Sequence, residues 1–352
     1  MDQTNHSVIV DERVVVKWLT PPAPLPHPTP DILAHLVEAG FNDTAPPYAA
    51  LTGVVNGREH LLALVTGYLP DARDGWEWCV DEAVAGTTAF AAAVGRLTAD
   101  LHLALSTLPH SPTTSEVAHA EGAATGPGAA PAAGPAPAAG LVERAEAALS
   151  EALAVTGGED GAWLAEQAEV MRRELGALTA SVTTPVTTPL IRIHGDLHVG
   201  QILQWRDGYA VIDFDGNPTV ADADPRQPAA RDVAQLTTSL EHVAQVAIKR
   251  RGTPPDQAAA WARRARAGLL AAYRDRLAAR HRPDLLDERL IRPFEVEQEC
   301  RELIYAARHL PRWRYAPMGV LHTWYDARKT AASTPAATPA PNPARKPEEN
   351  IA

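Results

Sequence analysis

The sequence has few cysteines, an excess of acidic over basic residues, and no long apolar run. Its 352 residues include only Cys79 and Cys300, far apart in the chain, so a fold stapled by disulfides is not expected. Lys and Arg number 32 against 43 Asp and Glu, a formal charge of −11. Nonspecific binding to nucleic acid or to an anionic membrane needs a basic surface and is therefore disfavoured. No segment approaches the roughly 18 uninterrupted apolar residues that a membrane-spanning helix needs.

The N-terminus shows no basic segment followed by an apolar stretch, so no cleavable leader is expected. Together with the unpaired cysteines, this predicts a soluble, cytoplasmic protein whose partners are small molecules or proteins. A chain of 352 residues fits one large two-lobed domain or two ordinary domains, with enough apolar material for a core.

Two stretches are rich in Ala, Pro and Gly or Thr and nearly free of large apolar side chains. Ordering residues 109–139 or the tail 331–352 would cost backbone entropy with little burial in return. We expect the first to be a flexible insert and the second to be disordered.

The rest divides near Tyr68. Before this residue, short β-branched runs surround one helical stretch at 30–39, which predicts a small sheet with a helix. After it, apolar positions recur at helical spacing. The expected strands are 8–10, 13–19, 51–55 and 60–66, and the expected helices are 83–105, 141–155, 164–178, 231–249, 255–277 and 285–308. The predicted fold class is α+β, with a small β-rich lobe at 1–68 and a large helical lobe at 69–330.

Acidic residues gather at the ends of three short predicted strands at 190–193, 201–205 and 209–212. Asp196, Gln201, Asp213 and Asp215 offer the hard oxygen atoms that hold Mg²⁺ together with phosphate and water. Asp196 could also accept a proton from a hydroxyl nucleophile. A single Asp after Gly often only caps a turn, but four such groups together favour a site.

His194 and His198 stand four residues apart, a spacing that suits a zinc pair on a helix. The flanking Gly195 and Gly200 and the neighbouring strands indicate a loop instead. A structural role for His194 is therefore favoured over metal binding.

The segment HGDLHVGQIL followed by IDFDG resembles the catalytic and metal-binding loops of the aminoglycoside phosphotransferase-like kinases, and in particular the maltokinase branch, in which Gln replaces the usual Asn. Further segments resembling the family are VVVKWL, LVEAGF, LVTGYLPDARDGWEW, GRLTADLHLAL, RDVAQL and ARHLPRW. The resemblance implies a bilobal protein-kinase-like fold and an ATP-dependent, Mg²⁺-dependent phosphotransferase.

The resemblance implies roles for individual residues. Asp196 would be the catalytic base, Gln201 and Asp213 would hold Mg²⁺, and Asp215 would assist at the metal or the phosphate. Lys17 would contact the α- and β-phosphates.

On the nucleotide side, the resemblance makes Asp31 the helix partner of Lys17. Ser7 closes the tetrapeptide 4–7, which stands where the family has a Gly-rich phosphate loop. The stretch from Thr66 through Tyr68 to Leu69 would receive adenine.

Polar and aromatic residues of the helical lobe are candidates for the acceptor pocket. Carboxylates bind sugar hydroxyls or an ammonium group, and an aromatic face packs on a sugar ring. A solvated helix face with Trp313 in the core is the alternative. The candidates, besides Asp196 itself, are Asp232, Glu297, Gln298, Glu302 and Trp313.

Two segments of the helical lobe resemble the acceptor-side segments of actinobacterial glucosamine kinases, namely SLEHVAQVAIKR and EVEQECRELIYAARHLPRW. Maltokinases resemble the chain from about Gln3 onward and carry an extra N-terminal cap domain, and an acidic pocket without a cap suits an amino sugar better than a disaccharide. We therefore expect a monomeric glucosamine kinase acting at the 6-hydroxyl. The alternatives are a maltokinase, an aminoglycoside phosphotransferase, a metal-dependent hydrolase using His194, Asp196, His198 and Asp213, and a nucleotide-binding regulator without catalysis.

Overall fold

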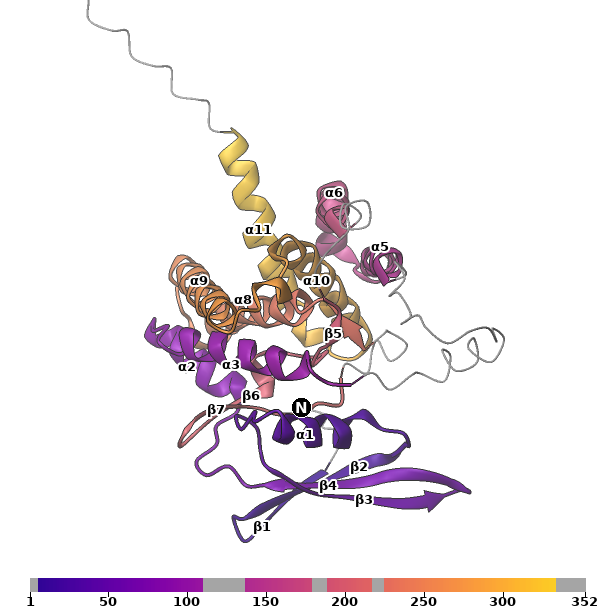
Figure 1. Ribbon diagram of the computed structural model, residues 1–352. Coiled ribbons are helices and arrows are strands. Elements are labelled where there is room, and N and C mark those ends of the chain that lie inside the picture. The colour runs from indigo at the N-terminus through magenta and orange to yellow at the C-terminus, as the bar shows by residue number, and fades with distance from the viewer. Residues whose placement is uncertain (1–5, 110–136, 179–188, 217–224, 334–352) are drawn as a thin grey trace, which may run out of the picture.

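The structure, a computed structural model, describes residues 6–109, 137–178, 189–216 and 225–333. Its N-terminal part is a four-stranded antiparallel sheet in the order β1-β2-β4-β3, with helix α1 on the face turned toward the remaining helices (Figure 1). The elements are β1 (His6–Val10), β2 (Val14–Pro24), α1 (Pro28–Glu38), β3 (Pro47–Val55) and β4 (Arg58–Gly67).

A tight turn fixes the register of β3 against β4. Val55 pairs with Arg58, so the hairpin loop is Asn56-Gly57, and both loop residues have positive φ, 50° and 77°. Two-residue hairpin turns of this kind require positive φ, which Asn and Gly tolerate best. The sheet's own buried cluster is small and consists of Leu19, Leu61 and Leu64.

The second part is helical and includes two small antiparallel strand pairs, β5 with β8 and β6 with β7. Its helices are α2 (Gly75–Ala85), α3 (Phe90–Leu105), α5 (Pro137–Val155), α6 (Gly158–Leu175), α8 (Ala230–Arg251), α9 (Pro255–Ala279), α10 (Ile291–Arg308) and α11 (Tyr315–Ser333). Its strands are β5 (Ile191–Arg192), β6 (Ile202–Trp205), β7 (Gly208–Val211) and β8 (Arg226–Gln227). Helix α8 is buried on nearly all sides for most of its length, as expected for a central helix.

The predicted division into a small sheet-containing part and a larger helical part is confirmed. The single helix predicted for 83–105 was wrong, because Gly86 ends α2 in the left-handed conformation with φ 73° and α3 begins at Phe90. The helix predicted from residue 285 begins at Ile291, after two short 3₁₀ turns.

The predicted insert and tail lie largely outside the described residues, at 110–136 and 334–352. The described chain is helical from Pro137, two residues before the expected end of the insert, and α11 runs to Ser333, past the expected start of the tail at 331. Among the helices that the structure describes, none combines the length and apolar character needed to cross a membrane.

Gly75, at the start of α2, has no room for a side chain. A Cβ there would lie 1.7 Å from the carbonyl oxygen of Val199. We expect Gly75→Ala to destabilise the protein by about 3 kcal/mol or more in urea unfolding, at the upper end of the cost of overpacking, because backbone must move. Gly268→Ala in α9 is the control, since its Cβ would meet only Ala91 Cβ at 3.5 Å. Equal unfolding midpoints for the two variants would contradict this close approach.

Candidate active site

The loop that joins β5 to β6 is held by its own histidine. The backbone N–H of His194 donates to Asp232 Oδ2 at 2.7 Å, and its Nε2 donates to the carbonyl of Ile212 at 3.0 Å. His194 Nδ1 accepts from the N–H of Asp196 at 3.3 Å. Since both ring nitrogens are engaged in holding the loop, His194 is structural, as the loop context predicted.

Helix α8 anchors the same loop through the side chain of Asp232. The carboxylate of Asp232 accepts from the N–H groups of His194 and Gly195, at 2.7 and 2.9 Å, and lies 3.1 Å from His102 Nε2. Burial pushes the pKa of Asp232 upward, but the hydrogen bond and charge of His102 and the other donors outweigh it, and the pKa lies below its usual value. Asp232 is fully buried. The prediction that it contacts the sugar was therefore wrong, and it supports the loop instead.

Asp196 lies at the open side of this loop. Its Oδ1 accepts from Gln235 Nε2 of α8 at 2.7 Å, and its Oδ2 lies 3.8 Å from His198 Nε2. The Asp196 side chain remains 21% exposed. A carboxylate with one oxygen anchored and some surface accessible can meet a bound molecule.

The β6–β7 hairpin brings Gln201 and Asp213 to one end. Ile202 pairs with Val211, and the N–H of Ile212 donates to the carbonyl of Gln201 at 2.9 Å. Asp213 follows with φ 66°, a left-handed conformation that is uncommon outside Gly. The hairpin thus brings the backbone of Gln201 and that of Asp213 close together at its open end.

Lys17 of β2 pairs with the carboxylates of both Asp213 and Asp215. Its Nζ lies 2.6 Å from Asp213 Oδ1 and 2.8 Å from Asp215 Oδ2. Burial lowers the pKa of Lys17, but the two carboxylates more than compensate and raise it. For Asp215, burial raises the pKa, and the charge and hydrogen bond of Lys17 with the hydrogen bond of Thr29 bring it below its usual value. This cluster carries two negative charges for one cation.

The predicted pairing of Lys17 with Asp31 was wrong. Asp31 is exposed on the first turn of α1. The residue of α1 that reaches the cluster is Thr29, whose hydroxyl donates to Asp215 Oδ1 at 2.7 Å. Residues two apart on a helix point in different directions, so both cannot face Lys17.

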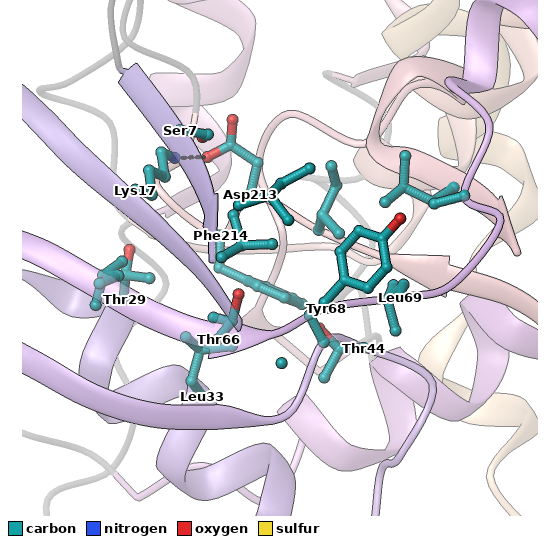
Figure 2. Close-up of a pocket in the computed structure, with 18 of the residues that line it drawn as sticks. Ser7, Lys17, Thr29, Leu33, Thr44, Thr66, Tyr68, Leu69, Asp213 and Phe214 are labelled. Atoms are coloured by element: carbon teal, nitrogen blue, oxygen red, sulfur yellow. Dashed lines mark hydrogen bonds and ion pairs between the residues drawn. The ribbon is translucent and has the colours of Figure 1, made fainter. Parts of the chain in front are cut away.

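A cavity of about 520 Å³ opens between the sheet and the second part of the chain, with Lys17 and Asp213 at one end (Figure 2). Its volume is within the range of small-molecule sites. All of the predicted nucleotide-side residues except Asp31 line it, namely Ser7, Lys17, Thr66, Tyr68 and Leu69, together with Asp213 and Asp215.

Three of the predicted acceptor residues form one hydrogen-bonded group. Gln298 Nε2 donates to Glu302 Oε1 at 3.0 Å, and Trp313 Nε1 donates to Glu302 Oε2 at 2.8 Å. Three aromatic rings lie between this group and Asp196. The ring centroids of Trp313 and Trp76 are 5.6 Å apart, and those of Trp76 and His198 are 5.8 Å apart. His198 Nε2 lies 3.8 Å from Asp196 Oδ2. Ring contacts therefore connect the cluster of Gln298, Glu302 and Trp313 to the loop that carries Asp196.

Glu297 does not join this group. It is fully buried between Arg231, at 2.9 Å, and Arg301, at 2.5 Å. Burial raises its pKa, but the two guanidinium groups dominate and lower it. The prediction of sugar contact was wrong for Glu297, because an acid with no exposed surface and two cationic partners is part of the protein interior.

Trp76 and Gln235 were not predicted as site residues. Trp78 is fully buried, whereas Trp76 is only partly buried. Two residues apart on α2, the two indoles face different sides, and this spacing is the signal that separates them.

In the part of the chain that the structure describes, no group of three or more His, Cys, Asp or Glu side chains is arranged to hold a metal ion. The hydrolase alternative needs such a group from His194, Asp196, His198 and Asp213, and His194 is committed to the loop by both ring nitrogens.

Glu241 of α8 is buried near helix α10. Burial, with the charge of Glu295, raises its pKa to about 7, against the pull of Arg266. The unfolded chain loses this proton near pH 4.3. Folding therefore stabilises the protonated acid, and stability falls as pH rises from about 4.5 to 7.

We expect Glu241→Gln, which mimics the protonated acid, to raise the free energy of unfolding at about pH 8 by up to about 3 kcal/mol and to change it little at about pH 4. Urea unfolding at both pH values measures this. Glu59→Gln, on an exposed position of β4, is the control and should show no such difference. A Glu241→Gln effect equal at both pH values would contradict the pKa shift.

The chain resembles known phosphotransferases. The model of the phosphotransferase enzyme family APH matches residues 16–216. A glucosamine kinase of Streptacidiphilus jiangxiensis is 42% identical over 339 residues, covering 90% of this chain and 70% of the relative. One of Mycolicibacterium smegmatis is 35% identical over 333 residues, covering 91% and 77%. The solved structure of a glucosamine kinase in complex with glucosamine, ADP and inorganic phosphate superposes with a TM-score of 0.77 at 35% identity, covering 93% of this chain and 81% of that one.

Proposed function

Because the chain belongs to the APH phosphotransferase enzyme family and is an ATP-dependent phosphotransferase, we propose that it is a glucosamine kinase that phosphorylates the 6-hydroxyl of D-glucosamine. The proposal draws on the relatives named glucosamine kinase and on one observation of this chain. Asp196 lies on the loop between β5 and β6. Through the hydrogen bond of His194 to Ile212, this loop reaches the end of the cavity that holds Lys17 and Asp213. Through the ring contacts of His198 with Trp76 and of Trp76 with Trp313, it reaches the cluster of Gln298, Glu302 and Trp313.

In this proposal the cavity receives ATP. Thr66, Tyr68 and Leu69 would surround the adenine, and Ser7 and Lys17 would lie along the phosphates. Lys17 would exchange its ion pairs with Asp213 and Asp215 for phosphate oxygens, a substitution of one anionic partner for another.

The residues at the hairpin end suit Mg²⁺. Gln201 and Asp213 would hold it, with Asp215 beside them, because an amide oxygen and carboxylates are hard donors and leave positions for phosphate and water. When bound, Mg²⁺ offsets the charge of the phosphate oxygens.

Asp196 would act as the base. It would take the proton of the acceptor hydroxyl as that oxygen forms its bond to the γ-phosphorus. The bond from the γ-phosphorus to the β–γ bridging oxygen breaks, and ADP leaves with the electron pair. The protein's contribution is to hold the hydroxyl, the base and the phosphate in line, which is where most of the rate enhancement of phosphoryl transfer arises.

The cluster of Glu302, Gln298 and Trp313 would form the acceptor side. The carboxylate of Glu302 can pair with the ammonium group of glucosamine, which neither glucose nor N-acetylglucosamine carries. The indoles of Trp313 and Trp76 offer apolar faces for the sugar ring.

The test is ADP release with MgATP and a panel of glucosamine, N-acetylglucosamine, glucose, maltose and kanamycin. We expect turnover with glucosamine to exceed that with every other acceptor, and phosphorus coupling to the protons on C6 in the NMR spectrum of the product. Preference for maltose or kanamycin would overturn the acceptor assignment, and coupling at another carbon would overturn the 6-hydroxyl.

A further inference from the structure

Helix α8 presents three polar side chains to the loop that carries Asp196. Asp232, Gln235 and Ser239 are spaced i, i+3 and i+7, so they share one face of the helix. Asp232 accepts from the N–H groups of His194 and Gly195, and Ser239 Oγ accepts from the N–H of Val199 at 3.0 Å. These two hold loop backbone. Of the three, Gln235 is the one that donates to a side chain of the loop, the carboxylate of Asp196.

We propose that Gln235 is a positioning residue for phosphoryl transfer, which fixes the orientation of the Asp196 carboxylate. The inference rests on the proposed function, in which Asp196 is the base. Gln235 is itself 6% exposed, and its Nε2 lies 2.7 Å from Asp196 Oδ1. Only the amide NH₂ can donate to a carboxylate, so the direction of this hydrogen bond is settled by chemistry.

The contact matters because the last torsion of an aspartate is soft. Rotation about χ2 of Asp is broad and roughly two-fold, so backbone contacts alone do not aim the carboxylate. A hydrogen bond to a charged acceptor is about twice as strong as a neutral one and restricts that rotation. On the other side, His198 Nδ1 accepts from the N–H of Gly200 at 3.0 Å, which leaves the proton on Nε2, 3.8 Å from Asp196 Oδ2.

Gln235→Met keeps the length of the side chain and removes the donor. We expect kcat for the preferred sugar to fall about 10- to 100-fold, the size expected for one hydrogen bond to a charged group, with KM for MgATP unchanged. Ser239→Ala is the control on the same face of α8. It removes a backbone anchor without touching the carboxylate, and its kcat should fall less. Wild-type kcat in Gln235→Met would overturn the inference.

Gln235→Glu separates positioning from a merely structural role. The introduced carboxyl group can donate to Asp196 only while it is protonated, and a neighbouring carboxylate favours that form. The ratio of variant to wild-type kcat should therefore rise at least about fivefold from about pH 8 to about pH 6, whereas the ratio for Gln235→Met stays flat. A flat ratio for Gln235→Glu would contradict the positioning role.

A readout independent of the acceptor distinguishes this inference from the proposed function. In protein labelled with ¹³C-aspartate, the Asp196 carboxyl resonance is assigned by its absence in Asp196→Asn. It should shift in Gln235→Met and stay in place in Ser239→Ala. A shift without sugar kinase activity in the wild type would reject the proposed function and keep the contact, and an unmoved resonance would reject the positioning role.

Discussion

Asp196→Asn is expected to lower kcat for sugar phosphorylation by about 10²- to 10⁴-fold, the range for removal of a general base. The amide keeps the shape of the carboxylate, and its oxygen can still accept from Gln235 Nε2, which lies 2.7 Å from Oδ1 in the native protein. It loses the capacity to take the proton of the acceptor hydroxyl. Steady-state ADP release gives kcat, and calorimetric titration with MgATP should give a dissociation constant within about threefold of the wild type.

Asp207→Asn is the matched control. Asp207 lies in the β6–β7 turn with its side chain 58% exposed, close in sequence to the site but facing solvent. It should retain wild-type kcat. A kcat for Asp196→Asn within tenfold of the wild type would remove Asp196 from the role of base, and a loss of MgATP binding would show that the substitution damages the nucleotide side.

Asp232→Ala is expected to lower the free energy of unfolding by about 3–5 kcal/mol, the cost of breaking a buried pair by removing one partner. The truncation leaves the N–H groups of His194 and Gly195 and the ring of His102 facing a void in a fully buried location. Urea unfolding followed by circular dichroism measures the effect. The same change should abolish sugar phosphorylation, because the loop that carries Asp196 loses its anchor.

Asp232 also makes a pH-dependent contribution of known sign. Its pKa is lowered in the folded protein, so the stabilisation is present above the unfolded value near 3.9 and is lost as pH falls through the folded value. The wild type should therefore lose stability below about pH 4 more steeply than Asp232→Asn. That variant keeps one oxygen acceptor and should be intermediate in stability at neutral pH. Identical acid unfolding curves would contradict the role assigned to Asp232.

The local motif around Asp196 was predictable because its geometry is set by neighbours in sequence. Glycines and strand ends place Asp196 and Asp213 at loop positions, and the hairpin that unites Gln201 with Asp213 is only a few residues long. The resemblance to kinases extended this to Lys17 and to Thr66, Tyr68 and Leu69, all of which line the cavity.

The predictions for Asp31, Asp232 and Glu297 were wrong because tertiary packing, and not the local sequence, determines which polar residue faces the site. The resemblance implied that Asp31 pairs with Lys17, but the rotation of α1 about its axis turns Thr29 to the cluster instead. Asp232 and Glu297 looked like pocket acids, yet each has buried cationic or amide partners contributed by distant segments. A sequence shows that an acid is present, but the elements packed around it decide whether it meets solvent.

The sheet and helix α1 belong to different packing units. Leu33 and Leu36 of α1 are part of the large cluster of the helical region, and His35 Nε2 lies 3.0 Å from the carbonyl of Ala104 in α3, whereas the sheet has only the small cluster around Leu61. Local opening costs least where few apolar contacts are lost. Amide hydrogens of β1 to β4 should thus exchange with deuterium sooner than those of α8. Because the cavity lies against this sheet, occupancy by a nucleotide would be recorded as slower exchange in the strands, a signal that needs no turnover and no knowledge of the acceptor.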